Sequence, residues 1–161
     1  DNSVGRLNLP PADDVSIGLG TDGMTSAMLA TCHAGYLIQR QAGVADTLIL
    51  NYLPQCLFKT NSTFASQLIG FQLGQIVAGA AADITVFDYI PVTPFNSDNI
   101  FRHIIYGMPS ARADMVMVDG QQIYTDGVFL TLDEELIREE AQKASQRVWK
   151  QFAETNVLHF K

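Results

Sequence analysis

The sequence predicts an α/β protein, and three observations support this class. An apolar run at about residues 15–20 leads into a Gly-Thr-Asp-Gly turn and then into a stretch with helical periodicity. Short strand-like runs follow after Gly79, and an amphipathic helix closes the chain. With 161 residues, 47% of them hydrophobic, the chain is long enough to bury a sizeable core.

Composition excludes several classes of function. A net charge of −7 with scattered basic residues argues against a nucleic-acid or anionic-membrane partner. No apolar run approaches the ~20 residues that cross a bilayer, so we expect no membrane association. Because no signal segment leads the chain, Cys32 and Cys56 indicate reduced thiols in a cytoplasmic protein, and we predict no disulfide.

The first half of the chain is predicted to be helical after its opening strand. Residues 1–14 contain two prolines and form a loop, residues 15–20 form the strand, and residues 24–41 form the first helix. Asp46 or Thr47 caps the next helix, through residue 57. Asn61 or Ser62 caps another helix, to residue 69, and Gly70 and Gly74 end this part.

The second half is predicted to be a small antiparallel sheet. Residues 82–88 and 114–118 form strands, and Asp119-Gly120 is a strong two-residue hairpin signal leading into residues 121–124. The connection contains Pro91 and Pro94, and residues 98–106 form a short helix.

The final helix starts at a capping box, Thr131 to Glu134. Its apolar positions share one face, with Glu139 and Lys143 paired on another, so we expect that face to pack against something. The apolar positions are Leu132, Leu136, Ile137, Ala141, Ala144, Val148 and Phe152.

Asp22 is the principal candidate site residue. It is expected at the carboxyl end of a strand, where α/β sheets and barrels hold their catalytic groups. Local sequence favours a structural role, because aspartate before a helix is a common N-cap or turn residue. A catalytic or metal-binding carboxylate is the alternative. Gly18-x-Gly20-x-x-Gly23 also fits a dinucleotide-binding turn, but Asp22 would repel a pyrophosphate there.

Neither the histidines nor the cysteines form a recognisable site. His33, His103 and His159 lack metal-ligand spacing, and a zinc site needs three or four ligands. Cys32 and His33 are neighbours on a helix and point about 100° apart, which disfavours a nucleophilic pair. We therefore interpret Cys32, His33 and His103 as packing or hydrogen-bonded structural residues.

An ordered set of motifs resembles the C-terminal part of the amidohydrolase superfamily. It is most similar to the branch of guanine deaminases and chlorohydrolase-like aminohydrolases, and within it to the aminohydrolase SsnA group. The resemblance covers nearly the whole chain from about residue 5. The motifs are Val15-x-Ile17-Gly18-Leu19-Gly20-Thr21-Asp22-Gly23, Leu73-Gly74, Ala82-Asp83-Ile84-Thr85-Val86-x-Asp88, Pro91-Val92-Thr93-Pro94, Tyr106-Gly107, Val118-Asp119-Gly120 and Trp149-x-x-Phe152.

The resemblance implies the C-terminal piece of a metal-dependent (β/α)8 barrel. Residues 1–74 would hold the last strand and its helices, residues 75–130 part of a small composite β-sandwich, and residues 131–161 a helix that packs back on the barrel. In such enzymes the aspartate after the eighth strand is catalytic and binds zinc or iron, a role that carries over to Asp22 alone. A full barrel needs about 250 residues. We therefore expect a fragment that binds no metal stoichiometrically by itself.

Two functions remain open at this point. The first is a fragment of a metal-dependent hydrolase that cleaves a C–N bond, or a C–Cl bond, of a small heterocyclic substrate, with deamination favoured. The fragment alone is expected to be inactive. The second is a non-catalytic α/β interaction module. In either case we expect a homo-oligomer, because a strand without neighbours leaves apolar area open to another copy.

Overall fold

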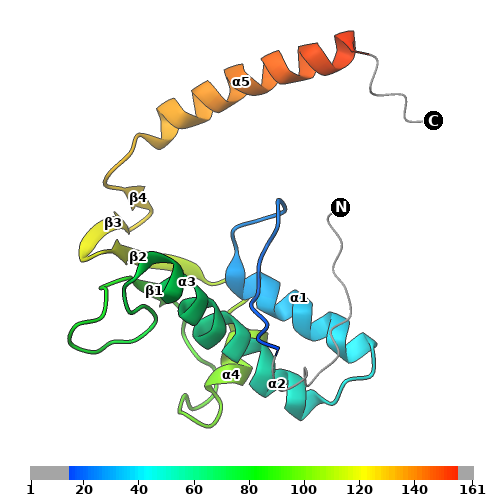
Figure 1. Ribbon diagram of the computed structural model, residues 1–161, viewed down its shortest axis with the longest axis vertical. Helices are drawn as coiled ribbons and strands as arrows, with labels where there is room; N and C mark the ends of the chain where they lie inside the picture. Colours follow the sequence, from blue (N-terminus) through cyan, green and yellow to red (C-terminus); the bar gives the residue numbers. More distant parts are fainter. Residues whose placement is uncertain (1–14, 156–161) are drawn as a thin grey trace.

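The computed structural model describes residues 15–155 as a helical part, an antiparallel sheet and a final helix (Figure 1). The predicted loop at 1–14 and His159 lie outside the described residues. The α-helices are α1 (Met28–Gln41), α2 (Asp46–Gln55), α3 (Asn61–Ile69), α4 (Ile100–Arg102) and α5 (Glu134–Glu154), with π-helical turns η1 (Cys56–Thr60) and η2 (His103–Gly107). The strands are β1 (Ile84–Asp88), β2 (Arg112–Val118), β3 (Gln121–Thr125) and β4 (Val128–Phe129).

The predicted strand at residues 15–20 is not formed in the described part of the chain, where this segment has no regular secondary structure. A strand exists only when a neighbouring strand completes its hydrogen bonds. The one sheet of the described residues contains β1 to β4 alone. The apolar sequence of this segment therefore lacks, in this part of the chain, the partner that would make it a strand.

One continuous helical run occupies residues 46–69, where we predicted two separately capped helices. Asp46 is the first residue of α2 rather than its cap, and the cap position, Ala45, makes no side-chain bond. Pro54 lies inside α2 and removes an amide donor. The π-helical η1 follows, and Thr60 and Asn61 both keep helical dihedral angles. Gly70, with φ of +80°, ends the run as predicted.

The core lies between α1, α2 and η2. Cys32, Ile49, Leu53 and Ile105 are each 0% exposed and form one cluster with Leu50. The helix α1 supplies Cys32, α2 supplies Ile49, Leu50 and Leu53, and η2 contributes Ile105 from far along the chain. Leu19, three residues before Asp22, packs against this cluster, which helps to position the segment that leads into the Asp22 turn.

The small antiparallel sheet is confirmed. Its strands lie in the order β1-β2-β3-β4, with every neighbouring pair antiparallel. The Asp119-Gly120 hairpin is also confirmed, and both residues have positive φ, +49° and +76°. Asp126-Gly127 repeats this geometry at +49° and +83° and leads into β4, which we did not predict because it is only two residues long.

The final helix exists, but its start differs from the prediction. Asp133, not Thr131, caps α5 by accepting a 3.0 Å hydrogen bond from the amide of Leu136. Lys143 does pair with Glu139, at 4.0 Å, and lies closer to Glu140, at 2.8 Å. No residue of α5 is buried, and the helix stands apart from α1 and α2 (Figure 1). None of the described helices could span a membrane.

Candidate functional site

Asp22 lies at an exposed turn between the segment 15–20 and α1. The amide of Met24 donates to the carbonyl of Thr21 at 3.3 Å, which closes the turn around Asp22 and Gly23. The amide of Gly23 donates to Oδ1 of Asp22 at 2.6 Å. Asp22 has a φ of +51°, a left-handed conformation that aspartate tolerates better than most residues. Unlike in the two hairpins, only the aspartate of this Asp-Gly pair has positive φ.

Asp22 does not cap α1, so the N-cap role that local sequence favoured is wrong. The helix begins at Met28, and its cap position is Ala27, which makes no side-chain cap bond. The turn role itself is confirmed. The dinucleotide-binding interpretation also weakens, because Gly23 precedes α1 by several residues and the described residues that lead into the motif form no strand.

Asn61 holds the backbone just before this turn. Its side-chain Nδ2 donates to the carbonyl of Leu19 at 2.8 Å, and its Oδ1 accepts from the amide of Leu19 at 3.0 Å. The two bonds reproduce the pairing that a neighbouring strand would supply. Gly18 makes the close approach possible, because a Cβ there would collide with Oδ1 of Asn61. We had predicted that Asn61 caps a helix. No local sequence pattern predicts its long-range contact with Leu19.

The two described histidines are structural, as predicted. Nδ1 of His33 bonds the carbonyl of Ile105 at 2.8 Å and thereby ties α1 to η2. His103 is buried, with Nδ1 2.6 Å from the hydroxyl of Tyr89 and Nε2 3.2 Å from the hydroxyl of Thr93. Both ring nitrogens of His103 are therefore occupied, which leaves neither for a metal ion.

The two cysteines are free buried thiols, as predicted. Burial, together with the neighbouring Cys56, raises the pKa of Cys32 from 9.0 to about 11. Burial likewise raises the pKa of Cys56 above its usual value. Since the thiolate is the reactive form, both groups are poor nucleophiles at neutral pH.

The described residues do not by themselves fit a metal ion. Across the described range 15–155, no three His, Cys, Asp or Glu side chains come together in a group that could hold one. Zinc bound by protein alone requires three or four such ligands. Asp22 is an exposed residue and by itself could supply one ligand at most.

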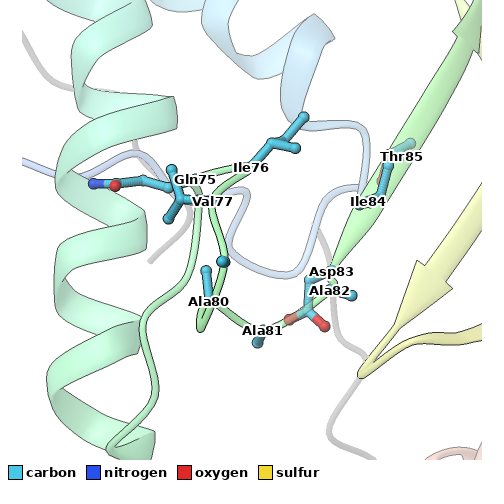
Figure 2. A pocket seen from close by; sticks show the side chains of 11 residues that line it. Gln75, Ile76, Val77, Ala80, Ala81, Ala82, Asp83, Ile84 and Thr85 are labelled. Carbon is cyan, nitrogen blue, oxygen red and sulfur yellow. The ribbon is translucent and has the colours of Figure 1, made fainter.

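A hollow of about 460 Å³ lies beside the loop that enters β1 (Figure 2). Its walls come from the segment between Gly74 and Thr85 and are mostly small or apolar, with Gln75 as a larger polar side chain. Asp83 is its one acidic residue, and Oδ1 of Asp83 already accepts a 2.7 Å bond from the amide of Asp119. That carboxylate anchors the hairpin, so the hollow presents no group suited to catalysis.

A tyrosine cluster that we did not predict locks η2 onto α1 and α2. The hydroxyl of Tyr36 donates to Oδ1 of Asp46 at 2.6 Å, and the hydroxyl of Tyr106 donates to that of Tyr36 at 2.8 Å. The bond to Asp46, then the bond to Tyr106, raises the pKa of Tyr36 above its usual value. The partners lie 10 and 70 residues from Tyr36, a separation that sequence patterns do not reveal.

Comparison with known proteins finds distant similarity to deaminases. The chain is 29% identical over 140 residues to the 5-methylthioadenosine/S-adenosylhomocysteine deaminase of Dictyoglomus thermophilum, covering 80% of this chain and 31% of that protein. It is 25% identical over 138 residues to the 5'-deoxyadenosine deaminase of Methanococcus aeolicus, covering 83% and 31%. The 5'-deoxyadenosine deaminase of Methanosphaera stadtmanae is 27% identical over 141 residues, covering 84% and 32%. No family model matches the chain.

The chain thus spans about a third of the length of the curated relatives it matches. The similarity extends over most of this chain, so it includes both the helical part and the sheet. The chain is a distant relative of deaminases that act on adenosine derivatives, over part of their length.

Proposed function

We propose that this chain is the C-terminal portion of a metal-dependent amidohydrolase that deaminates an amino-substituted heterocycle. The observation that carries the proposal is the Asp22 turn, which lies within an ordered motif set resembling that superfamily, in a chain distantly related to deaminases. The relatives are about three times as long as this chain. The remaining metal ligands and most of the substrate pocket would therefore come from residues upstream.

The proposed role of Asp22 follows from the chemistry of deamination. Water adds to the ring carbon that bears the amine, and ammonia leaves, so one proton must pass from the water to the leaving nitrogen. The carboxylate of Asp22 would accept that proton. It would also be one ligand of a zinc or iron ion, whose contribution when bound is to make water nucleophilic near neutral pH. Its exposure leaves it accessible to both groups.

The fold of the parent enzyme is proposed as a (β/α)8 barrel with a small sandwich. Residues 15–20 would pair as the last barrel strand once its neighbours are present. The two bonds between Asn61 and Leu19 support this, because the side chain of Asn61 bonds both backbone groups of Leu19 as a neighbouring strand would. The division at residues 74 and 130 stays a prediction.

The substrate class is proposed as a purine or purine nucleoside that carries an exocyclic amine. The relatives are named for 5'-deoxyadenosine, 5-methylthioadenosine and S-adenosylhomocysteine. The motifs instead resemble the guanine deaminase and chlorohydrolase-like branch, closest to the SsnA group. Both lines share hydrolytic removal of a substituent from a nitrogen heterocycle, and deamination is the reaction common to them.

The test compares this chain with the longer protein that contains it. The longer protein is expected to release ammonia from at least one of 5'-deoxyadenosine, adenosine, guanine or cytosine and to retain metal through dialysis. The chain of 161 residues alone is expected to do neither. Tight one-to-one zinc binding by the chain alone would contradict the proposal, as would a folded, metal-loaded longer protein inactive on every substrate.

The second candidate function is a non-catalytic module that binds a partner. One observation favours it, namely the exposed apolar side chains along α5. The two functions are compatible if the module joins copies of the enzyme.

A further inference from the structure

Leu19 is held by two different parts of the fold just before the Asp22 turn begins. Its side chain packs against the core cluster, and both of its backbone polar groups bond the side chain of Asn61, at 2.8 and 3.0 Å. Gly20 and Thr21 alone separate Leu19 from Asp22. A displacement of Leu19 is therefore passed on to the carboxylate of Asp22, because little chain lies between them to absorb it.

Asn61 projects from a helical run that the core fixes in place. It is the first residue of α3, and the run continues from α2 through η1 into α3. Ile49 and Leu53 of α2 are each 0% exposed, so the beginning of this run is packed inside the core. A side chain on a rigid, packed element holds its partner more precisely than one on a loop. The contact therefore determines where the backbone of Leu19 lies.

Asparagine suits this position because its side-chain amide contains both a donor and an acceptor. Oδ1 accepts from the amide of Leu19, while Nδ2 donates to the carbonyl of the same residue. A carboxylate can only accept, and alanine can do neither. Gly18 leaves room for this approach, since a Cβ at that position would collide with Oδ1 of Asn61. Two residues far apart in the sequence are thus matched to one contact.

The contact is compatible with strand pairing of residues 15–18 in the longer protein. In a strand the amide and carbonyl of one residue face the same neighbouring strand, and those of the next residue face the opposite one. Asn61 occupies the side that Leu19 faces, so pairing on that side stops at Leu19. Pairing of Ile17 on that side, and of Gly18 on the other, is not obstructed by Asn61. Asn61 therefore marks the point where the strand would end and the turn begins.

Building on the proposed function, we propose that Asn61 is a positioning residue for deamination, which holds the carboxylate of Asp22 in place by fixing the backbone of Leu19. Asn61 acts through Asp22 and is assigned no contact with the substrate itself. A proton acceptor must lie within hydrogen-bond reach of the proton that it takes, and a misplacement of about 1 Å can cost about a hundredfold in rate. Since most of the substrate pocket lies upstream, loss of the contact should affect the chemical step more than substrate binding.

The first experiment measures steady-state deamination by the longer protein. Asn61→Ala removes both bonds, so we expect kcat to fall about 10- to 100-fold while KM changes less than about threefold. Asn61→Asp keeps the size and shape of the side chain but cannot donate to the carbonyl of Leu19, so it should also lower kcat.

Ser66→Ala is the matched control for these variants. Ser66 lies on the same helix, α3, and its hydroxyl accepts a 2.9 Å bond from the amide of Leu73 at a partly buried position. The substitution therefore removes a bond between a side chain and the backbone of a segment that follows the helix, and leaves the contact with Leu19 intact. We expect kcat of this variant to stay within about twofold of wild type.

The second experiment follows the Asp22 turn without measuring activity. Amide hydrogen exchange of the longer protein, measured by mass spectrometry in peptides that cover residues 19–24, reports how often this backbone opens. Loss of both bonds in Asn61→Ala should speed exchange there at least about fivefold, whereas Ser66→Ala should leave it unchanged. Circular dichroism checks that each variant keeps its helix content.

The results separate this inference from the proposed function. A wild-type longer protein that is inactive on every substrate refutes the proposed function, and the inference with it. In an active enzyme the inference is overturned if Asn61→Ala keeps the wild-type kcat or raises KM alone. It is also overturned if Ser66→Ala lowers kcat as much, or if exchange over residues 19–24 is unchanged in Asn61→Ala. If Asn61→Ala does not fold, the same criteria apply to Asn61→Asp.

Discussion

The contact between Asn61 and Leu19 yields the sharpest prediction about how the Asp22 turn is held. Asn61→Ala removes two hydrogen bonds, of 2.8 and 3.0 Å, to one partly buried backbone residue. Each bond contributes about 1 kcal/mol net, and more when its backbone partner stays unsatisfied. We expect the free energy of unfolding to fall by about 2 kcal/mol relative to the matched control.

The control is Asn51→Ala, which makes the same exchange within α2. Asn51 is exposed and bonds only the carbonyl of Thr47, one helical turn earlier. Both variants gain the same helix propensity from alanine, so the difference between them isolates the Leu19 contact. Urea denaturation gives both free energies, and amide hydrogen exchange at Leu19 shows whether the loss is local. Two variants within about 0.5 kcal/mol of each other would refute the reasoning.

A double-mutant cycle with Gly18 strengthens this test. Gly18→Ala places a methyl group against Oδ1 of Asn61, so it should destabilise the wild type. In the Asn61→Ala background the colliding atom is gone, and the same substitution should cost clearly less. Equal costs in the two backgrounds would show that Gly18 and Asn61 are not coupled.

Three further predictions concern the rest of the fold. Ile105→Ala should lower the free energy of unfolding by about 2–5 kcal/mol in urea, because this side chain is 0% exposed, whereas Ile90→Ala, at an 84% exposed position, should change little. The raised pKa of Cys32 means that, as pH rises, the thiol of the unfolded chain loses its proton before that of the folded chain, so the free energy of unfolding should fall between about pH 9 and pH 11. Urea midpoints measured across this pH range should show the fall, and Cys32→Ala should make it less steep. Asp133→Ala should cost about 1 kcal/mol through loss of the cap, seen as reduced helix content at 222 nm or an earlier thermal transition.

Local signals predicted the elements whose partners are near in sequence. The Asp119-Gly120 turn determines its own backbone conformation, and the two strands beside it pair because that turn joins them. The final helix was predicted from its own periodicity. Its start was misplaced by two residues because Thr131 and Asp133 are both good capping residues.

Contacts made over long distances were not predicted. Asn61 reads as a capping residue, yet it lies inside a helical run and bonds Leu19, 42 residues away. At residues 15–20 a local signal predicted a strand that is not formed here. The sequence is apolar, but a strand forms only where another segment pairs with it. The same holds for the candidate site. Local sequence predicts that Asp22 is a turn residue, but it does not predict which distant groups come near it.

Kinetics of the longer protein with a substitution at Asp22 test whether this carboxylate transfers the proton and binds the metal. Asp22→Asn keeps the shape of the side chain but removes its charge and its ability to accept a proton. Asp126→Asn is the matched control, at another left-handed Asp-Gly turn with a φ of +49°. We expect the rate of ammonia release to fall at least about a thousandfold for Asp22→Asn, in line with loss of a proton-transfer group and metal ligand, and to stay near wild type for Asp126→Asn. Wild-type activity and metal content in a folded Asp22→Asn enzyme would contradict the account.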